Sequence, residues 1–255
     1  MSFSPAITQI LFDMALADHL VGVTTQCVLP PGQRRRTVGD TLKMEAEAIL
    51  AAEPDLLLAQ ARLDGFEAVQ KADPNIQIEH FTIESLEDIA SAVERIGKLT
   101  SKPQLACDAK ARFVDRCRTV GRRTAGLARR RVLFVIGYKN PLAAGSGTFI
   151  DEMIHLAGGQ NAGAPPVPHL RWRAMDIESI QLAAPDVLIC QADAATEQAA
   201  MEYFRSVPDL PAAGTGRIFV VTDRRWTIPS TYSAVLLSQL ADMIHPEIPG
   251  KGAGR

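Results

Sequence analysis

The residues of this 255-residue chain that could do chemistry show none of the spacings that local catalytic motifs require. Its five histidines form no H-E-x-x-H pair, and the sequence contains no G-x-S-x-G. Its four cysteines have no C-x-x-C spacing and no histidines at zinc-finger distances. The sequence therefore predicts no catalytic residue, no protein-bound metal and no disulfide scaffold.

One turn offers an enzymatic alternative. Gly145, Ser146, Gly147 and Thr148 precede a predicted helix, and their backbone N–H groups could cradle a phosphate or cofactor. The turn lacks the third glycine of G-x-G-x-x-G and the Gly-Lys-Ser/Thr ending of a P-loop. The other interpretation is a glycine turn in which Thr148 caps the helix.

Composition and charge exclude several other classes. The chain is 47% hydrophobic and 22% charged, as expected of a globular protein, and its net charge is −2. We interpret the arginine runs at 34–36, 122–123 and 129–131 as solvated faces and not as nucleic-acid sites. No apolar stretch reaches the ~18 residues that a membrane helix needs. Residues 1–5 have neither the features of a signal peptide nor a lipobox.

Helical and strand periodicities alternate along the chain, which predicts an α/β fold. A seam of apolar residues through 104–129 predicts one helix of about 39 Å at 1.5 Å per residue. We expect two Rossmann-like lobes with central parallel sheets, 1–102 and 131–255, joined by this long rigid helix at 103–130. The other predicted helices are 5–17, 45–52, 85–99, 148–157, 176–183, 196–205 and 230–245, and the predicted strands are 20–24, 55–59, 76–79, 131–136, 186–190 and 217–221.

An internal repeat supports the two lobes. Residues 44–60 align with residues 175–191, and both segments carry a glutamate, a Pro-Asp pair and a final glutamine at the same places. A helix-to-strand turn would explain the Pro-Asp pair and the apolar residues, but not the matching glutamate and glutamine. We therefore interpret the lobes as duplicated.

Two such lobes leave a cleft between them, and ligands of open parallel sheets bind beyond the carboxyl ends of the strands. The lysine and arginine side chains expected beyond the strand ends favour an anionic ligand. The tyrosine and tryptophan rings expected there offer flat faces for a planar group. Ordinary packing is the alternative for each aromatic side chain. The candidate ligand-binding residues are Gln26, Cys27, Gln60, Arg62, Tyr138, Lys139, Trp172, Arg224, Arg225 and Trp226, with Trp172 expected on a proline-rich loop at 164–173.

The order and spacing of several segments resemble the class III periplasmic substrate-binding proteins, receptors with a helical backbone that carry cobalamin, haem and ferric siderophores to ABC importers. The resemblance covers nearly the whole chain and is carried by residues 4–11, 20–24, 30–31, 47–59, 131–134, 147–161, 178–189 and 245–246. It implies a non-catalytic periplasmic receptor, expected to be monomeric, that grips a metal chelate between its lobes. It implies no cofactor besides that cargo, and a permease dimer as partner.

The sequence departs from the family in ways that matter. Members normally begin with a full strand before the Ser-Pro segment, and only residues 1–3 precede it here, so we expect the first lobe to lack a strand. Cobalamin-binding members place aromatic residues where this chain has Gln26, Thr41 and Gln60, which weakens the corrinoid assignment. A cytosolic remnant that binds a protein partner is a third hypothesis, consistent with the missing signal.

Two glutamates form the expected docking pair. Glu47 and Glu178 each lie two residues, or about 200° around a helix, from Ile49 or Ile180, which we expect to be buried. Both carboxylates should therefore face water. In the resembling family such glutamates dock onto arginines of a homodimeric permease; the alternative is that glutamate merely suits the first turn of a helix.

Overall fold

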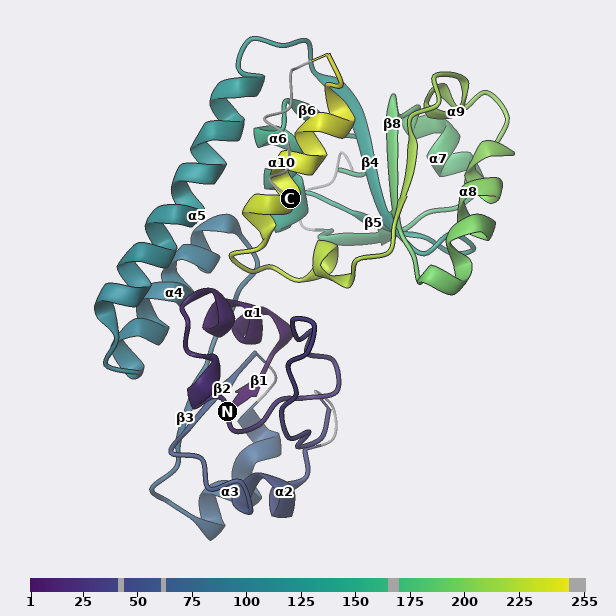
Figure 1. Cartoon of the computed structure of the whole chain (residues 1–255). Coiled ribbons are helices and arrows are strands. Elements are labelled where there is room, and N and C mark those ends of the chain that lie inside the picture. Colours follow the sequence, from purple (N-terminus) through teal and green to yellow (C-terminus); the bar gives the residue numbers. More distant parts are fainter. Residues whose placement is uncertain (41–43, 61–62, 165–169, 248–255) are drawn as a thin grey trace. The chain divides into compact units, whose positions relative to one another are not determined.

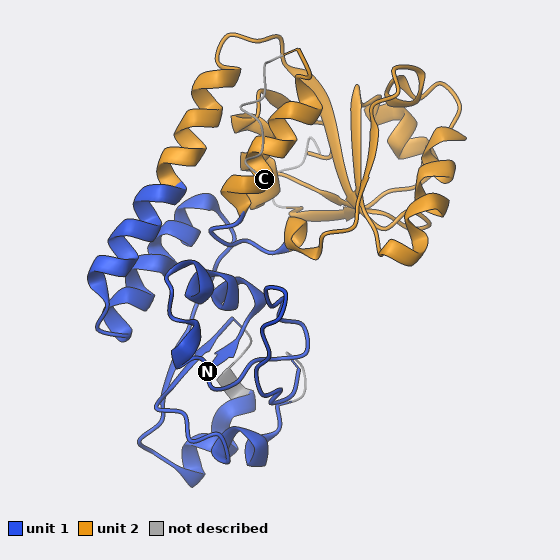
Figure 2. Ribbon diagram, viewed as in Figure 1, with its two compact units in different colours: residues 1–113, 228–232 blue, residues 114–227, 233–255 orange. Residues whose placement is uncertain are grey.

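A computed structural model of the chain describes residues 1–40, 44–60, 63–164 and 170–247 (Figure 1). These residues form two compact units, which are described one at a time (Figure 2). Unit 1 comprises residues 1–113 and 228–232, and unit 2 comprises residues 114–227 and 233–255. The boundary falls inside the long helix α5 (Pro103–Thr124). Among the described residues, no helix combines the length and apolar character that crossing a membrane requires.

Unit 1 is built on a parallel sheet in the order β1 (Ser2–Phe3), β2 (Leu56–Ala59) and β3 (Gln77–His80). Helix α1 begins where the Ser4 hydroxyl accepts a hydrogen bond from Ile7 N and Pro5 fixes the first helical residue. Phe3 and Phe66 meet edge to face in the core, with centroids 4.9 Å apart. The helices of unit 1 are α1 (Pro5–Asp13), α2 (Ala46–Leu50), α3 (Glu67–Ala72) and α4 (Leu86–Leu99), besides the first part of α5.

Two expectations about the strands of unit 1 are wrong. The first strand is present, because Ser2 and Phe3 pair with Leu58 and Ala59. The predicted strand at 20–24 is not formed, and Val23 makes only isolated bridges to Ser2 and Thr37. Leu20 and Val23 are buried without joining a ladder, and Val21 between them is exposed, so the pattern resembles that of a strand.

Helix α5 follows the predicted apolar seam but ends at Thr124, five residues before the predicted end at 129. Ala106, Ala109, Phe113 and Val120 lie on its buried side. The Thr124 hydroxyl donates a hydrogen bond to Leu156 O at 2.7 Å, and Gly126 adopts a positive φ of 79° two residues later. A left-handed residue stops a helix, and glycine takes that conformation without a steric penalty.

Unit 2 has a mixed sheet with β4 at its centre. Parallel pairs join β4 (Arg130–Ile136) to β8 (Val187–Gln191), β8 to β9 (Ile218–Val221), and β4 to β6 (Gly159–Asn161). Antiparallel pairs join β4 to β5 (Leu142–Ala144) and β5 to β7 (Trp172–Ala174). Helices α7 (Ile177–Ala183), α8 (Glu197–Arg205) and α9 (Pro211–Gly214) cover one face, and α6 (Phe149–Leu156) and α10 (Ser233–Ile244) cover the other (Figure 1).

The repeat predicted from the sequence is visible in both units. Each copy is a short helix, a Pro-Asp turn and a central strand: α2 leads into β2, and α7 leads into β8. Strand β2 pairs in parallel with β1 and β3, and β8 pairs in parallel with β4 and β9. Ile49 and Ile180 are both fully buried. The predicted α/β fold with two lobes on largely parallel sheets is confirmed.

Candidate functional site

A pocket of about 370 Å³ opens in unit 2 where β4 and β8 end. The backbone N–H of Gly137 donates to Gln191 O at 2.9 Å, which holds the two loops together. Gly137 has a positive φ of 74°, so the chain can turn sharply away from the end of β4. The residues that line the pocket are Ile136, Gly137, Tyr138, Lys139, Asn140, Gln191, Ala192, Asp193 and Thr196.

Tyr138 and Lys139, both predicted from the sequence, line this pocket. The half-buried Tyr138 ring meets Tyr203 edge to face, with centroids 5.7 Å apart. The Lys139 ammonium lies 5.8 Å from the centroid of the Tyr138 ring, within the range of a cation–π interaction. The exposed carboxylate of Asp193 balances this cation in the lining. The pocket thus offers a flat aromatic surface, a cation, a carboxylate and neutral hydrogen-bonding groups.

A buried thiol lies in β8, one residue before Gln191 of the pocket lining. Cys190 is fully buried, and its Sγ lies 3.4 Å from Gly137 O. Burial raises the pKa of Cys190 to about 12. Burial therefore favours the protonated thiol over the thiolate. Among the described residues, no three His, Cys, Asp or Glu side chains are placed to hold a metal ion.

The three ligand-binding candidates that follow β9, Arg224, Arg225 and Trp226, lie in different environments. Arg224 is exposed, whereas Arg225 forms a bidentate ion pair with Asp223, with Nε and Nη2 at 2.9 and 2.7 Å from Oδ2. Burial opposes ionisation of Asp223, but the hydrogen bonds from Arg225 outweigh it and hold the pKa of Asp223 below its ordinary value. Trp226 is only 2% exposed, so the structure places it in the core and favours the packing alternative.

Trp172 does not lie on the predicted loop. It is the first residue of β7 and pairs with Ala144 of β5, and it does not line the pocket. The sequence pattern does not indicate this strand, because β7 is only three residues long and follows a proline-rich segment. Its indole is half-buried, so its contact with a ligand stays a prediction.

In unit 1 the candidate residues gather around the first turn of α1. The Ser4 hydroxyl donates to Gln60 Oε1, and Thr8 Oγ1 lies 3.1 Å from Cys27 Sγ. Gln60 O also lies 3.2 Å from His80 Nε2, at the end of β3. Gln60 follows β2 as Gln191 ends β8, so both copies of the repeat place a glutamine at the carboxyl end of a central strand.

The remaining candidates are less informative in unit 1. Gln26 is half-buried one residue before Cys27. Arg62 and Thr41 lie outside the described residues. Asn140, Asp193 and Thr196 of the lining are not among the predicted ligand-binding residues, although the first two lie in the loops that follow predicted strands. Gln191 was also omitted, and its identity with Gln60 across the repeat was the signal that could have found it.

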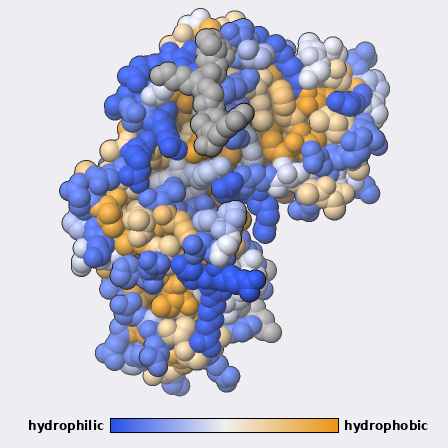
Figure 3. All heavy atoms as spheres, viewed as in Figure 1, coloured by the Kyte–Doolittle hydropathy of each residue, from blue (hydrophilic) through white to orange (hydrophobic). Residues whose placement is uncertain are grey.

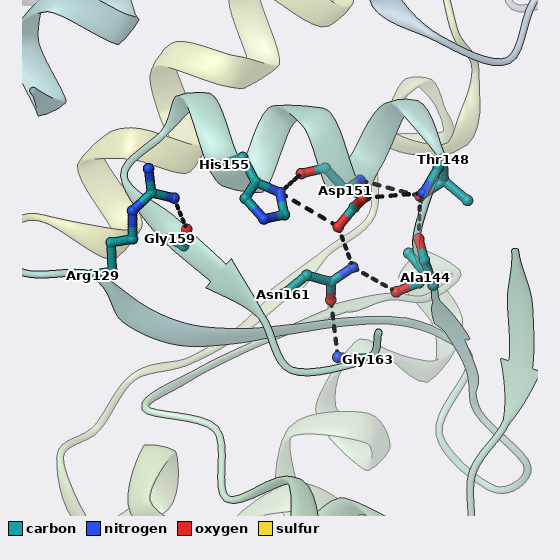
Figure 4. A network of polar contacts seen from close by, with 10 residues as sticks. Arg129, Ala144, Thr148, Asp151, His155, Gly159, Asn161 and Gly163 are labelled. Carbon is teal, nitrogen blue, oxygen red and sulfur yellow. Dashed lines mark hydrogen bonds and ion pairs between the residues drawn. The ribbon is translucent and has the colours of Figure 1, made fainter. Parts of the chain in front are cut away.

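The glycine turn before α6 is used for helix capping. Asp151 N donates to Thr148 Oγ1, and Gly147 N donates to Asp151 Oδ2, each at 3.1 Å. Asn161 then donates to Asp151 Oδ1 at 2.9 Å and to Ala144 O at 3.0 Å, which ties α6 to β5 and β6 (Figure 4). A phosphate at this turn would have to displace the Asp151 carboxylate from Gly147 N.

Gly145 has a packing role in the same turn. Its N–H donates to Arg171 O at 2.7 Å, and a Cβ at this position would lie 2.1 Å from Leu170 O. Glycine is therefore required because two backbone segments approach closely. The turn matches the capping interpretation, and its geometry does not favour the phosphate site on which the enzyme alternative rests.

The two docking candidates have the predicted orientation. Glu47 on α2 and Glu178 on α7 are exposed, and Ile49 and Ile180 two residues later are fully buried. Among the described residues, neither glutamate forms an ion pair. Each unit therefore presents an unpaired carboxylate on the helix that precedes its central strand.

Comparison with known proteins agrees with this architecture. The model of the periplasmic binding protein family matches residues 1–224. The vitamin B12-binding protein of Yersinia pestis (strain Pestoides F) is 28% identical over 196 residues, which are 74% of this chain and 67% of that protein.

Solved structures resemble the chain over nearly its whole length. A periplasmic haem-binding protein from Pseudomonas aeruginosa has a TM-score of 0.85 at 20% identity, covering 99% of this chain and 94% of that one. The haem-binding protein RhuT from Roseiflexus sp. RS-1 has a TM-score of 0.83 at 21% identity, covering 96% and 97%. The vitamin B12-binding protein BtuF of Vibrio cholerae has a TM-score of 0.80 at 20% identity, covering 96% and 95%. At these identities the likeness shows the fold, and the match of the family model establishes membership: this chain belongs to the periplasmic binding protein family.

Proposed function

We propose that this protein is the substrate-binding component of an ABC importer and that it binds a metal chelate, such as a ferric siderophore, haem or cobalamin. The observation that carries the proposal is the pocket at the carboxyl ends of β4 and β8. It has the aromatic face of Tyr138, the cation of Lys139 and the amide of Asn140 in one lining, the combination that a planar or ring-shaped chelate with polar substituents can use.

The corresponding edge of unit 1 supports the same proposal. Gln60, Cys27 and His80 lie where the strands of that unit end or in the adjoining loop, and their partners fix them in place. Hydrogen-bonding groups at the carboxyl ends of these strands suit a ligand with polar groups around its rim. The metal would belong to the cargo, and the protein is proposed to need no cofactor of its own.

A periplasmic location and a permease partner form part of the proposal. The family supplies substrate-binding components to importers, and one neighbour, from Listeria monocytogenes, is described as an ABC transporter substrate-binding protein. We assign Glu47 and Glu178 to docking, because they are exposed, unpaired carboxylates at equivalent places of a repeat. A partner with two-fold symmetry would meet such a pair with two equivalent cations.

The alternatives have less support. An enzyme would need the turn at 145–148 to hold a phosphate or cofactor, and the N–H groups of Gly145 and Gly147 already bond within the protein. A cytosolic protein that binds only a protein partner would leave the pocket at Tyr138 and Lys139 without a role.

The test is to purify the protein from its native host and to record its absorbance and the mass of any bound molecule. We expect a visible band from haem, a corrinoid or a catecholate–iron complex, lost in a Tyr138→Ala/Lys139→Ala variant that folds normally. Leu142→Ala, which truncates an exposed side chain outside the pocket, serves as the control and should retain the band. A bound nucleotide in place of a chelate would contradict the proposal.

A further inference from the structure

The outer face of α7 combines a carboxylate with an unusually exposed leucine. Leu182 is 87% exposed, whereas the other exposed large apolar side chains of the described residues reach at most 48%. On the surface in view in Figure 3, hydrophilic residues cover much of both units. A single exposed apolar residue needs no explanation by itself. Leu182, however, lies one helical turn after Glu178, on a helix that carries a second exposed apolar residue, Ile177.

Helical geometry places these side chains on one side of α7. Glu178 and Leu182 are four residues apart, so their Cβ atoms lie about 5–6 Å from one another. Ile177 and Leu182 are about 140° apart around the axis, with Glu178 between them. Ile180 and Ala183 occupy the opposite side and are buried against the sheet. The exposed side of α7 therefore carries the Glu178 carboxylate beside Leu182. The half-buried Gln181, whose amide donates to Pro208 O at 2.9 Å, lies between Glu178 and Ile177.

Comparison with the other copy of the repeat indicates that the fold does not require large aliphatic residues at positions 177 and 182. In unit 1, Glu47 is followed four residues later by Ala51, which is exposed at the position that matches Leu182. Ala46 occupies the position that matches Ile177. At the position that matches Gln181, α2 carries the half-buried Leu50. The outer side of α2 thus shows no exposed large apolar side chain, so Leu182 serves no need of the helix-to-strand unit itself.

We propose that Ile177, Glu178 and Leu182 form a docking surface for the importer's permease, in which Leu182 inserts into an apolar recess beside a cation that pairs with Glu178. This inference rests on the proposed function, because it takes the permease as the partner. The inference goes beyond an ion pair between each glutamate and the permease. It makes the permease contact of unit 2 largely apolar, through Leu182, and that of unit 1, where Ala51 stands at the matching position, mainly electrostatic.

The negative charge of this surface favours the permease over two other partners, a second copy of this chain and an anionic lipid surface. A second copy of the chain meeting this face symmetrically would bring Glu178 against its own counterpart, and Asp176 at the start of α7 adds further negative charge. The same carboxylates would be repelled by an anionic lipid surface. A protein that offers an apolar recess and a guanidinium or ammonium group satisfies both features of the face.

The experiment measures binding of the ligand-loaded protein to the permease–ATPase complex of its importer in nanodiscs. Leu182→Ala, which reproduces the unit 1 residue, should weaken binding at least about tenfold, because burial of a leucine side chain is lost. Leu182→Met should retain most of the affinity. Val21→Ala truncates a 43% exposed apolar side chain of unit 1 and should leave binding unchanged. All three variants should keep the wild-type chelate affinity and unfolding temperature.

The outcomes separate this inference from the proposed function. If Leu182→Ala binds the importer like the wild type while Glu178→Arg does not, the apolar contact is wrong and the receptor function stands. If Leu182→Ala instead converts a dimer of this chain into monomers with unchanged importer binding, the face is a contact between copies and the inference is wrong. If the wild type binds neither a chelate nor the importer, both proposals fail.

Discussion

The indole of Trp226 stacks on the ring of Phe134, with centroids 6.2 Å apart and 30° between the planes. Phe134 lies in the central strand β4, and Trp226 lies in the 3-10 turn at Arg224–Thr227 that follows β9. Both side chains are at most 2% exposed. The pair therefore fastens the segment after β9 to the middle of the sheet.

We predict that Trp226→Ala destabilises the fold, in contrast to the selective loss of ligand affinity expected of a residue that contacts only ligand. Truncating a buried aromatic side chain costs about 3–5 kcal/mol of the free energy of unfolding. Urea unfolding followed by far-UV circular dichroism measures this change. The half-buried Trp172 is the matched control, and Trp172→Ala should cost less. A loss below about 1 kcal/mol for Trp226→Ala would contradict the packing assignment.

A second prediction compares two glycines with the same backbone conformation. Gly126 and Gly158 have φ values of 79° and 78°, so alanine is strained at both positions. A Cβ at Gly158 would lie 2.7 Å from His245 Nε2, whereas a Cβ at Gly126 meets nothing within 4 Å. Gly158→Ala should lower the free energy of unfolding by about 1–3 kcal/mol more than Gly126→Ala. Equal losses in denaturant titrations would show that the buried His245 moves freely.

Thiol reactivity provides a third prediction. Burial raises the pKa of Cys117 to about 11 and that of Cys190 to about 12, while Cys107 is exposed. Iodoacetamide at pH 8 should alkylate Cys107 before Cys117 or Cys190, because the thiolate is the reactive form. Peptide mass spectrometry follows the order of modification. Modification of Cys190 as fast as that of Cys107 in the folded protein would refute this prediction.

The same shifts imply a dependence of stability on pH. The unfolded chain ionises these thiols near the ordinary value of 9.0, and the folded chain keeps them protonated to a higher pH. The unfolded state therefore loses protons first, and the free energy of unfolding should fall as the pH rises from about 9 to 11. Unfolding titrations at several pH values should show a smaller decline for Cys190→Ala than for the wild type. Identical declines would mean that Cys190 does not contribute.

The fifth prediction concerns the docking glutamates. Reversing both charges in a Glu47→Arg/Glu178→Arg variant should abolish stimulation of the importer's ATPase, because cations on the permease would face cations. Chelate affinity should stay unchanged, since both residues lie on the helices before the central strands and not at their carboxyl ends. A Glu67→Arg/Glu197→Arg variant changes equal charge on other helices and controls for net charge. Normal stimulation by the first variant would remove the docking role.

The repeat was predictable because its signal is local. In each copy a buried isoleucine, a Pro-Asp turn and a run of apolar residues determine one helix and one strand, and Ile49 and Ile180 are buried as their positions predicted. Side-chain periodicity also located the buried face of α5, although not its end at Thr124. Gly126, with its positive φ, is a local signal of that end, and the hydrogen bond from Thr124 to Leu156 O, far along the chain, supports it.

The strands and residues that were mispredicted depend on distant partners. Strands β5, β6 and β7 have three residues each, too few for a periodicity to be read, and they exist because they pair with β4 or with one another. For Trp226 the sequence leaves ligand contact and packing open, and its stacking on the distant Phe134 favours packing. Tyr138 and Lys139 line a pocket, as expected of residues just after a strand whose end is easily recognised, and their contact with a ligand stays a prediction.

The most direct test of the central claim is isothermal titration of the purified protein with haem, cyanocobalamin and a panel of ferric siderophores, accompanied by thermal unfolding. The account predicts saturable binding of at least one chelate, with a midpoint of unfolding that rises with ligand concentration by mass action. Tyr138→Ala/Lys139→Ala should weaken that binding at least about tenfold without lowering the unfolding midpoint of the unliganded protein. An absence of binding to every chelate, together with a midpoint raised by a nucleotide, would contradict the claim.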